Sequence, residues 1–144
     1  MKKNILEINR RSGCAVSMAL DAVGDKWSLL ILRDLMFTEK RSYGELQASE
    51  EKIATNILAS RLVTLEENGL ICKQSDPADS RRNLYFLTDK GIHLVPVVIE
   101  LMQWMSKFSL DAFACSKNLT AYKRDRVALY KEIMADLRQQ HLKR

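Results

Sequence analysis

Polar side chains between residues 55 and 60 could contact the edges of nucleic-acid bases. An Asn side chain can form two hydrogen bonds with adenine, and Ala or a Thr methyl group can contact the methyl group of thymine. Helical spacing places Asn56 and Ser60 opposite a stripe of leucines, on the side facing away from a core. The candidate base-contacting residues are Thr55, Asn56, Ala59 and Ser60. The alternative is that Asn56 and Ser60 are ordinary solvated helix residues.

A second group of candidate residues is mostly basic. Arg81 and Arg82 are adjacent in a segment rich in turn-forming residues, 76–83. Two guanidinium groups on a thin loop can enter a minor groove or contact phosphates, although a solvated pair is the alternative. Contacts with the phosphate backbone fix the register of a protein on DNA without reading the sequence. Four further residues are expected to make such contacts: Arg41, Tyr43, Lys52 and Arg61.

Cys14 is the candidate reactive residue. It precedes a predicted helix, where amide dipoles can lower the pKa of a thiol, and Arg10 and Arg11 are near in sequence. The alternative is a small buried hydrophobic residue. Cys72 and Cys115 are expected to pack or to be inert. Three scattered cysteines do not suggest a disulfide framework, so a reducing compartment is the simplest setting.

Other chemistry has no supporting pattern. The potential metal ligands Cys14, Cys72, Cys115, His93 and His141 include no pair with the spacing of a metal site. The sequence also has no nucleophile elbow, phosphate-binding loop or paired catalytic carboxylates. We therefore expect a protein that is not an enzyme and that needs neither metal nor cofactor.

The elements that would position the candidate residues form a helix-turn-helix. Asp25 is a predicted N-cap, Ser42 and Glu45 form a capping box, and Gly69 ends the last helix in the left-handed conformation. Hydrophobic periodicity and these signals predict four helices in this region: 15–23, 25–37, a short helix from Ser42 to the break at Ala48, and 54–68.

A hairpin and two longer helices follow. Strands 70–75 and 84–87 flank the basic segment, which makes the hairpin a wing. Thr88 is expected to cap a long helix over 89–113, kinked at Pro96 and apolar around much of its circumference. A last helix is predicted over 119–140. The fold class is therefore mainly α with a small β-hairpin (α+β), a winged helix-turn-helix with long C-terminal dimerisation helices. Both Trp27 and Trp104 are expected to anchor the core.

Several linked motifs run in order along residues 14–110. They are Ala19–Trp27 followed by Leu29–Arg33, Tyr43–Leu46, Ile53–Leu58, Leu65–Leu70 and Tyr85–Gly91. Together they resemble the HxlR-type bacterial transcription regulators. The resemblance implies a DNA-binding winged helix and, in some members, a cysteine at the position of Cys14 that senses oxidants or electrophiles. Two residues depart from the family pattern, Ala15 in place of Pro and Asp25 in place of Gly, and the wing is also similar to that of MarR-type regulators.

Charge and length define the domain organisation. The chain has 144 residues and a formal net charge of +5. Residues 1–116 carry equal numbers of acidic and basic side chains, so the whole excess lies in the tail. We divide the chain into an N-terminal arm (1–13), a winged-helix domain (14–113) and a C-terminal helical extension (114–144). No segment is apolar enough to span a membrane and no secretory signal is evident, which predicts a cytoplasmic protein.

Dimerisation would connect this fold to a function. One recognition helix contacts few base pairs, whereas a two-fold dimer doubles the contacts on a palindrome whose half-sites are roughly 34–36 Å apart. We therefore expect a homodimeric regulator that binds double-stranded operator DNA, with thiol oxidation or a small-molecule effector as its signal. The alternatives are a MarR-like repressor that responds to a small molecule, and a winged-helix protein-interaction module without DNA contact.

Overall fold

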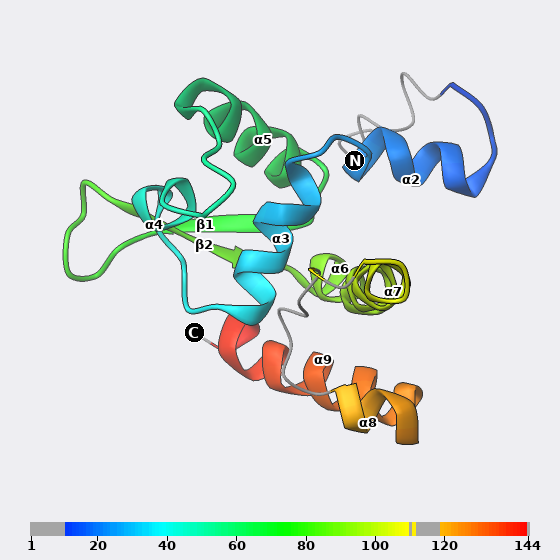
Figure 1. Cartoon of the computed structure of the whole chain (residues 1–144). Helices are drawn as coiled ribbons and strands as arrows, with labels where there is room; N and C mark the ends of the chain where they lie inside the picture. Colours follow the sequence, from blue (N-terminus) through cyan, green and yellow to red (C-terminus); the bar gives the residue numbers. More distant parts are fainter. Residues whose placement is uncertain (1–10, 110, 112–118, 144) are drawn as a thin grey trace.

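The computed structural model describes residues 11–109, 111 and 119–143. This part of the chain is mostly helical and contains one two-stranded antiparallel sheet (Figure 1). The elements are α2 (Ala15–Val23), α3 (Ser28–Phe37), α4 (Tyr43–Gln47), α5 (Thr55–Glu67), β1 (Ile71–Ser75), β2 (Asn83–Leu87), α6 (Asp89–Ile92), α7 (Val95–Ser106), α8 (Leu119–Arg124) and α9 (Arg126–Leu142). The predicted fold class, mainly α with a small hairpin, is confirmed.

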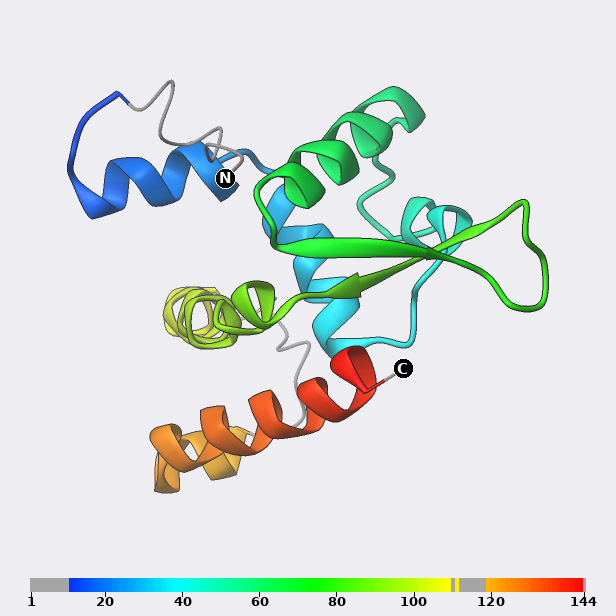
Figure 2. The same ribbon diagram turned by 180° about the vertical axis from the view of Figure 1, so that it is seen from behind.

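The hydrophobic core forms around α3, which lies between α4 and α5 on one side and the C-terminal helices on the other (Figures 1 and 2). Leu32 and Leu35 of α3 are completely buried. The predicted leucine stripe of α5 faces this core, and its members are also buried: Leu58, Leu62 and Leu65. Burial of this stripe leaves the opposite face of α5 exposed to solvent.

Local capping signals position the helix-turn-helix. Asp25 Oδ1 accepts hydrogen bonds from the amides of Trp27 and Ser28, both at 2.9 Å, so it caps α3 although the regular helix begins only at Ser28. Ser42 and Glu45 form the predicted capping box at the start of α4. Gly69 ends α5 with φ +68°, a conformation that favours glycine.

The wing is built on β1 and β2, which pair antiparallel from Ile71↔Leu87 to Ser75↔Asn83. The segment before α4 lies along the free edge of β2. There the amide of Tyr85 donates to the carbonyl of Arg41 at 2.7 Å, and Ser42 forms a bridge with Leu84. These bonds tie the start of the helix-turn-helix directly to the wing.

The prediction of one continuous helix over 89–113 is wrong. The helix is divided into α6 and α7, and Pro96 lies in the first turn of α7, where a missing N–H costs nothing. Gly91 in α6 packs directly against the backbone of Leu70, because a Cβ at position 91 would lie 2.1 Å from the carbonyl oxygen of Leu70. Helix α7 ends at Ser106, and the predicted end at Phe113 lies outside the described residues.

Two further predictions need correction. The C-terminal helix is interrupted at Asp125, whose extended backbone and side chain cap the start of α9 by accepting from the amide of Ala128. Trp104 is not a core anchor, since 57% of it is exposed, whereas Trp27 packs against the core as expected. No helix in the described ranges combines the length and apolar character needed to cross a bilayer.

Candidate nucleic-acid interface

The four predicted base-contacting residues share one exposed face of α5. Thr55, Asn56, Ala59 and Ser60 are all exposed, while the leucines of the same helix are buried. Val63 continues this face one turn further and is 52% exposed. An exposed β-branched side chain can contact a thymine methyl group in the same way as Ala or Thr. Val63 was not among the predicted site residues, although its helical spacing from Asn56 and Ser60 places it on the same side of the helix.

Helix α4 holds the first turn of α5 in place. Tyr43 Oη donates a hydrogen bond to the carbonyl of Thr55 at 2.7 Å, so this side chain links the two helices. A hollow of about 310 Å³ lies between the start of α4 and the wing, lined by Ser42, Tyr43, Gly44, Arg81, Arg82, Asn83 and Tyr85. The first turn of α5 and the wing loop point to the same side of the molecule (Figures 1 and 2). The two elements that carry these candidate residues therefore lie on the same side of the molecule (Figures 1 and 2).

The wing arginines are exposed and each has a carboxylate neighbour. Arg81 makes a two-point contact with Asp79, with its Nε 3.0 Å and its Nη2 3.1 Å from the two carboxylate oxygens. This contact lowers the pKa of Asp79. Arg82 Nε lies 3.9 Å from Asp76. Both guanidinium groups remain accessible, because the side chains of Arg81 and Arg82 are 88% and 52% exposed.

Two more basic residues lie near the first turns of α5, one within the helix and one before it. Arg61 Nη1 lies 3.5 Å from Asp25 Oδ2, so this arginine connects α5 to the start of α3 and leaves 30% of its side chain exposed. A second hollow, of about 300 Å³, lies beside it. Lys52 precedes α5, is exposed, and has φ +53°, a left-handed conformation that is strained for a lysine.

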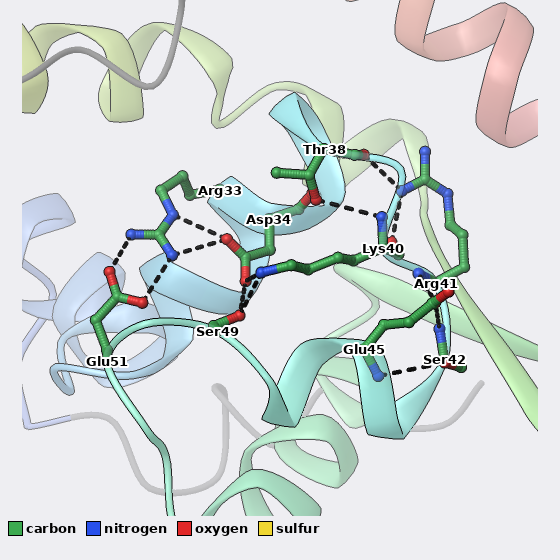
Figure 3. Close-up of polar contacts among 9 residues, drawn as sticks. All are labelled: Arg33, Asp34, Thr38, Lys40, Arg41, Ser42, Glu45, Ser49 and Glu51. Carbon is green, nitrogen blue, oxygen red and sulfur yellow. Dashed lines mark hydrogen bonds and ion pairs between the residues drawn. The ribbon is translucent and has the colours of Figure 1, made fainter.

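Arg41, which was predicted to contact the DNA backbone, is half-buried, and its guanidinium contacts groups of the protein itself. Its Nη1 donates to the carbonyls of Thr38 and Lys40, at 3.0 and 2.6 Å (Figure 3). Its Nη2 lies 3.2 Å from Nε2 of His141. Burial lowers the pKa of this guanidinium, although Glu39 and Glu45 act in the opposite direction. The guanidinium therefore has partners within the fold, one of them far away in the sequence, and its contact with DNA stays a prediction.

A buried polar cluster that sequence reasoning missed holds the turn before α5 (Figure 3). Asp34 is 3% exposed and accepts hydrogen bonds from Arg33, Lys40 and Ser49. Arg33 also binds both carboxylate oxygens of Glu51, at 2.5 and 3.1 Å, which lowers the pKa of Glu51 to about 2. These bonds fix residues 49–51, which lead into α5. The sequence offered one signal for this cluster, the position of Asp34 among the apolar residues of α3.

Cys14 is exposed at the N-cap of α2, so the alternative of a buried cysteine is wrong. The amides of Ser17 and Val16 lower the pKa of its thiol. Arg11 is not available to add to this effect, because it pairs with Asp21 at 2.7 Å. Arg10 and Cys115 lie outside the described residues, and Cys72 is half-buried in β1. Within the described part of the chain, no group of three potential ligands could hold a metal ion.

An apolar stripe lies on the side of the molecule away from the wing. Its members on α7 and in the turn directly after it are between 42% and 75% exposed: Val97, Leu101, Trp104, Met105 and Phe108. Val16 and Leu20 of α2, which lies on the same side, are exposed as well (Figure 1). Helix α9 packs against α7 without covering this stripe. We call these seven residues the apolar stripe.

Comparison with known proteins agrees with this architecture. The crystal structure of PA1607 matches with a TM-score of 0.64 at 38% identity, over 73% of this chain and 70% of that one. The reduced form of the transcriptional regulator YodB from Bacillus subtilis matches with a TM-score of 0.55 at 31% identity, over 67% of this chain and 95% of that one.

Sequence comparison gives the family. An uncharacterized HTH-type transcriptional regulator of Mycobacterium tuberculosis is 38% identical over 100 residues, 69% of this chain. The matched part is 62% of that protein, so the chain spans less than two thirds of this relative. A family model described as HxlR-like helix-turn-helix matches residues 22–112. The chain therefore belongs to the HxlR-like helix-turn-helix family, as its motifs predicted.

Proposed function

We propose that the protein is a transcriptional regulator that binds operator DNA as a homodimer. The observation that carries the proposal is the exposed face of α5, which presents Asn56 and Ser60 beside the two wing arginines. In a winged helix of this kind, the N-terminal part of the second helix enters the major groove and reads base edges. Arg81 and Arg82 then contact the adjacent minor groove or its phosphates.

The backbone contacts are assigned to three residues. Lys52 and Arg61 lie on either side of the first turns of α5, and Tyr43 orients its first residue. Phosphate contacts of this kind supply affinity and register but carry no base preference. The hollow between α4 and the wing and the hollow beside α5 give room for the sugar-phosphate strands.

The dimer is assigned to the apolar stripe. Exposed apolar side chains that form a continuous patch mark interaction sites, and a two-fold interface uses the same patch on both copies. Because α2 and α7 lie on the side opposite the wing, two copies joined there leave both α5 faces free (Figure 2). Such a dimer recognises a palindrome, since its two half-sites are related by the same two-fold axis.

The signal is assigned to Cys14. Its thiol is exposed and the pKa is lowered by the amides of Ser17 and Val16, which favours the reactive thiolate. The relative YodB is known in a reduced form and in a diamide-treated form, and this pair makes thiol chemistry the favoured signal for this chain. Cys14 is the N-cap of α2, and α2 carries part of the apolar stripe. We therefore expect modification of the Cys14 thiol to change the dimer interface.

The experiment is selection of a preferred duplex from a randomised DNA pool, followed by affinity measurements on the selected sequence. Asn56→Ala should weaken binding to this duplex and relax the preference at one base position, by about 1–3 kcal/mol of discrimination. Gln139→Ala, on an exposed position of α9, is the matched control and should bind normally. If no sequence is enriched and no salt-dependent DNA binding is observed, the protein-interaction alternative is favoured.

A further inference from the structure

His141, in the last turn of α9, is completely buried against the wing. Its Nδ1 accepts a hydrogen bond from the backbone amide of Leu87, the last residue of β2, at 3.0 Å. The ring also meets Phe86 edge to face, with centroids 6.0 Å apart. An amide can only donate, so Nδ1 must carry a lone pair. The imidazole thus completes the hydrogen bonding of a buried strand end.

The other side of the ring meets the entry to the helix-turn-helix. Because Nδ1 accepts, Nε2 carries the ring hydrogen and packs against the Arg41 guanidinium, 3.2 Å from its Nη2, without a hydrogen bond between the two donors. Nη1 of Arg41 holds the carbonyls of Thr38 and Lys40. The carbonyl of Arg41 accepts from Tyr85 in the wing, and its amide donates to Glu45 of α4. His141 therefore lies where the wing and the turn before α4 meet.

The opposite end of α9 is fixed to α7. Tyr130 donates a hydrogen bond to Glu100 of α7, and Tyr122 of α8 donates to the same carboxylate at 3.1 Å. Between the two ends, Leu137 is buried and Arg138 pairs with Asp89 of α6 at 2.7 Å. Helix α9 thus connects α7, which carries the apolar stripe, to the base of the wing (Figure 1).

We infer that His141 is a positioning residue for DNA binding, through which α9 holds the wing and the entry to α4 in a fixed orientation relative to α7. The family model ends at residue 112, so the segment that carries this contact lies beyond the family match. The inference rests on the proposed DNA-binding function, because the orientation matters only if the wing and α5 contact the duplex together.

Three substitutions separate positioning from packing. In His141→Leu, the Leu87 amide is left buried without an acceptor, while the side chain remains apolar. In His141→Asn, the side-chain oxygen lies near the position of Nδ1 and can accept from this amide. In His141→Gln, the oxygen lies one atom further out, near the position of Nε2, where it can accept from Arg41 but misses the bond from the Leu87 amide.

The test measures affinity for a mixed-sequence DNA duplex by fluorescence anisotropy, together with hydrogen exchange of the Leu87 amide by NMR. We expect His141→Leu and His141→Gln to weaken binding about tenfold, equivalent to ~1.4 kcal/mol, and to accelerate exchange at Leu87. His141→Asn should bind DNA within about twofold of the unsubstituted protein. In this variant the Leu87 amide should also remain protected from hydrogen exchange, unlike in the other two variants.

Each outcome decides the inference. If the unsubstituted protein does not bind DNA, the proposed function fails and the exchange result alone tests the contact. If the protein binds and all three variants bind equally well, His141 is not a positioning residue. Equal losses in His141→Asn and His141→Gln would assign the effect to packing. If none of the three variants folds, the role is structural and the inference is overturned, because it requires an intact core.

Discussion

Arg81 and Arg82 meet carboxylates of their own loop in the free protein, at 3.0 Å from Asp79 and 3.9 Å from Asp76. Binding to a phosphate must therefore replace or share these partners. Exposed ion pairs contribute little in water, so the exchange costs little compared with the release of counterions from DNA. The two acidic side chains of the wing loop thus offset the charge of its two arginines. The net attraction of the loop to DNA depends on how readily Arg81 and Arg82 exchange these carboxylates for phosphates.

The first prediction follows from this balance. Arg81→Ala should weaken binding to the selected duplex and reduce the slope of log affinity against log salt by about 1. Asp79→Asn should strengthen binding, because it removes the competing charge but keeps an acceptor for the Arg81 amide. A titration over a range of salt concentrations measures both. Arg126→Ala, on an exposed arginine at the start of α9, is the control and should leave the slope unchanged.

The second prediction concerns Cys14. Since hydrogen bonds from the Ser17 and Val16 amides hold the pKa of its thiol below the ordinary value of 9.0, the thiolate forms at a lower pH than in a free cysteine. Alkylation should therefore be faster at Cys14 than at half-buried Cys72, and its rate should rise with pH and level off below pH 9. Mass spectrometry after timed alkylation measures both sites.

A control variant and a binding assay link this reactivity to function. Diamide should reduce DNA affinity in the unsubstituted protein and leave Cys14→Ser unaffected. If Cys14 is not modified, or if its modification does not change DNA binding, the redox part of the proposal is wrong.

At the level of elements, two carboxylates hold the helix-turn-helix together. Glu45 accepts from the amides of Arg41 and Ser42 at the start of α4, and Glu51 binds Arg33 before α5. The backbone amides lower the pKa of Glu45 to about 2, and the Arg33 guanidinium has the same effect on Glu51. Both groups therefore bind fewer protons in the folded state than in the unfolded chain at mildly acidic pH.

The third prediction is a loss of stability in acid. With pKa values lowered from 4.5 to about 2, the contribution of both groups is complete above pH 4.5 and disappears as the pH falls toward 2. Urea midpoints should decrease over this range, and Glu45→Gln or Glu51→Gln should flatten the profile. Added salt should weaken the Glu51 part more than the Glu45 part, because only Glu51 depends on an ion pair. Equal profiles in all variants would contradict this assignment.

The predictability of these elements depended on the range of the contacts that define them. The capping box at Ser42, the turn at Gly69 and the wing strands arise from residues within a few positions, and the sequence predicted them correctly. The exposed face of α5 followed from the leucine period. Breaks at Leu94 and Asp125 were missed because the apolar pattern continues through them.

Long-range contacts explain the remaining errors. The contact between Arg41 and His141 was not predicted, because the two residues are 100 positions apart in the sequence and no local pattern marks the contact. The cluster around Asp34 depends on Ser49, which lies in the turn before another helix. Trp104 was placed in the core because large aromatic residues are usually buried, whereas here it belongs to a surface.

At the scale of the whole molecule, the proposed DNA-binding residues and the proposed dimer interface lie on two different faces. The wing and the start of α5 lie on one side, and the apolar stripe of α2 and α7 lies on the other (Figures 1 and 2). The side chains of Trp104 and Phe108 pack on each other, with ring centroids 6.2 Å apart, but remain 57% and 75% exposed. Burying such rings against a second copy gains apolar contact that the single chain does not provide.

The fourth prediction is that one charge in this stripe separates the dimer. Because Trp104 is exposed in the single chain, Trp104→Glu should leave the core intact but place a carboxylate in the interface, which is costly without a partner. Sedimentation equilibrium at micromolar concentration should show a dimer for the unsubstituted protein and a monomer for this variant. Val127→Glu, at a similarly exposed apolar position on α9, is the matched control and should remain a dimer.

DNA binding should change with the assembly. A monomer contacts one half-site, so Trp104→Glu should bind the full palindrome no more tightly than a duplex with a single half-site, while the unsubstituted protein should prefer the palindrome strongly. Equal affinity of the unsubstituted protein for the two duplexes would show that it does not use the two half-sites together. A monomeric unsubstituted protein with full affinity for the palindrome would remove the two-fold dimer from the mechanism and leave α5 and the wing to recognise DNA as a single unit.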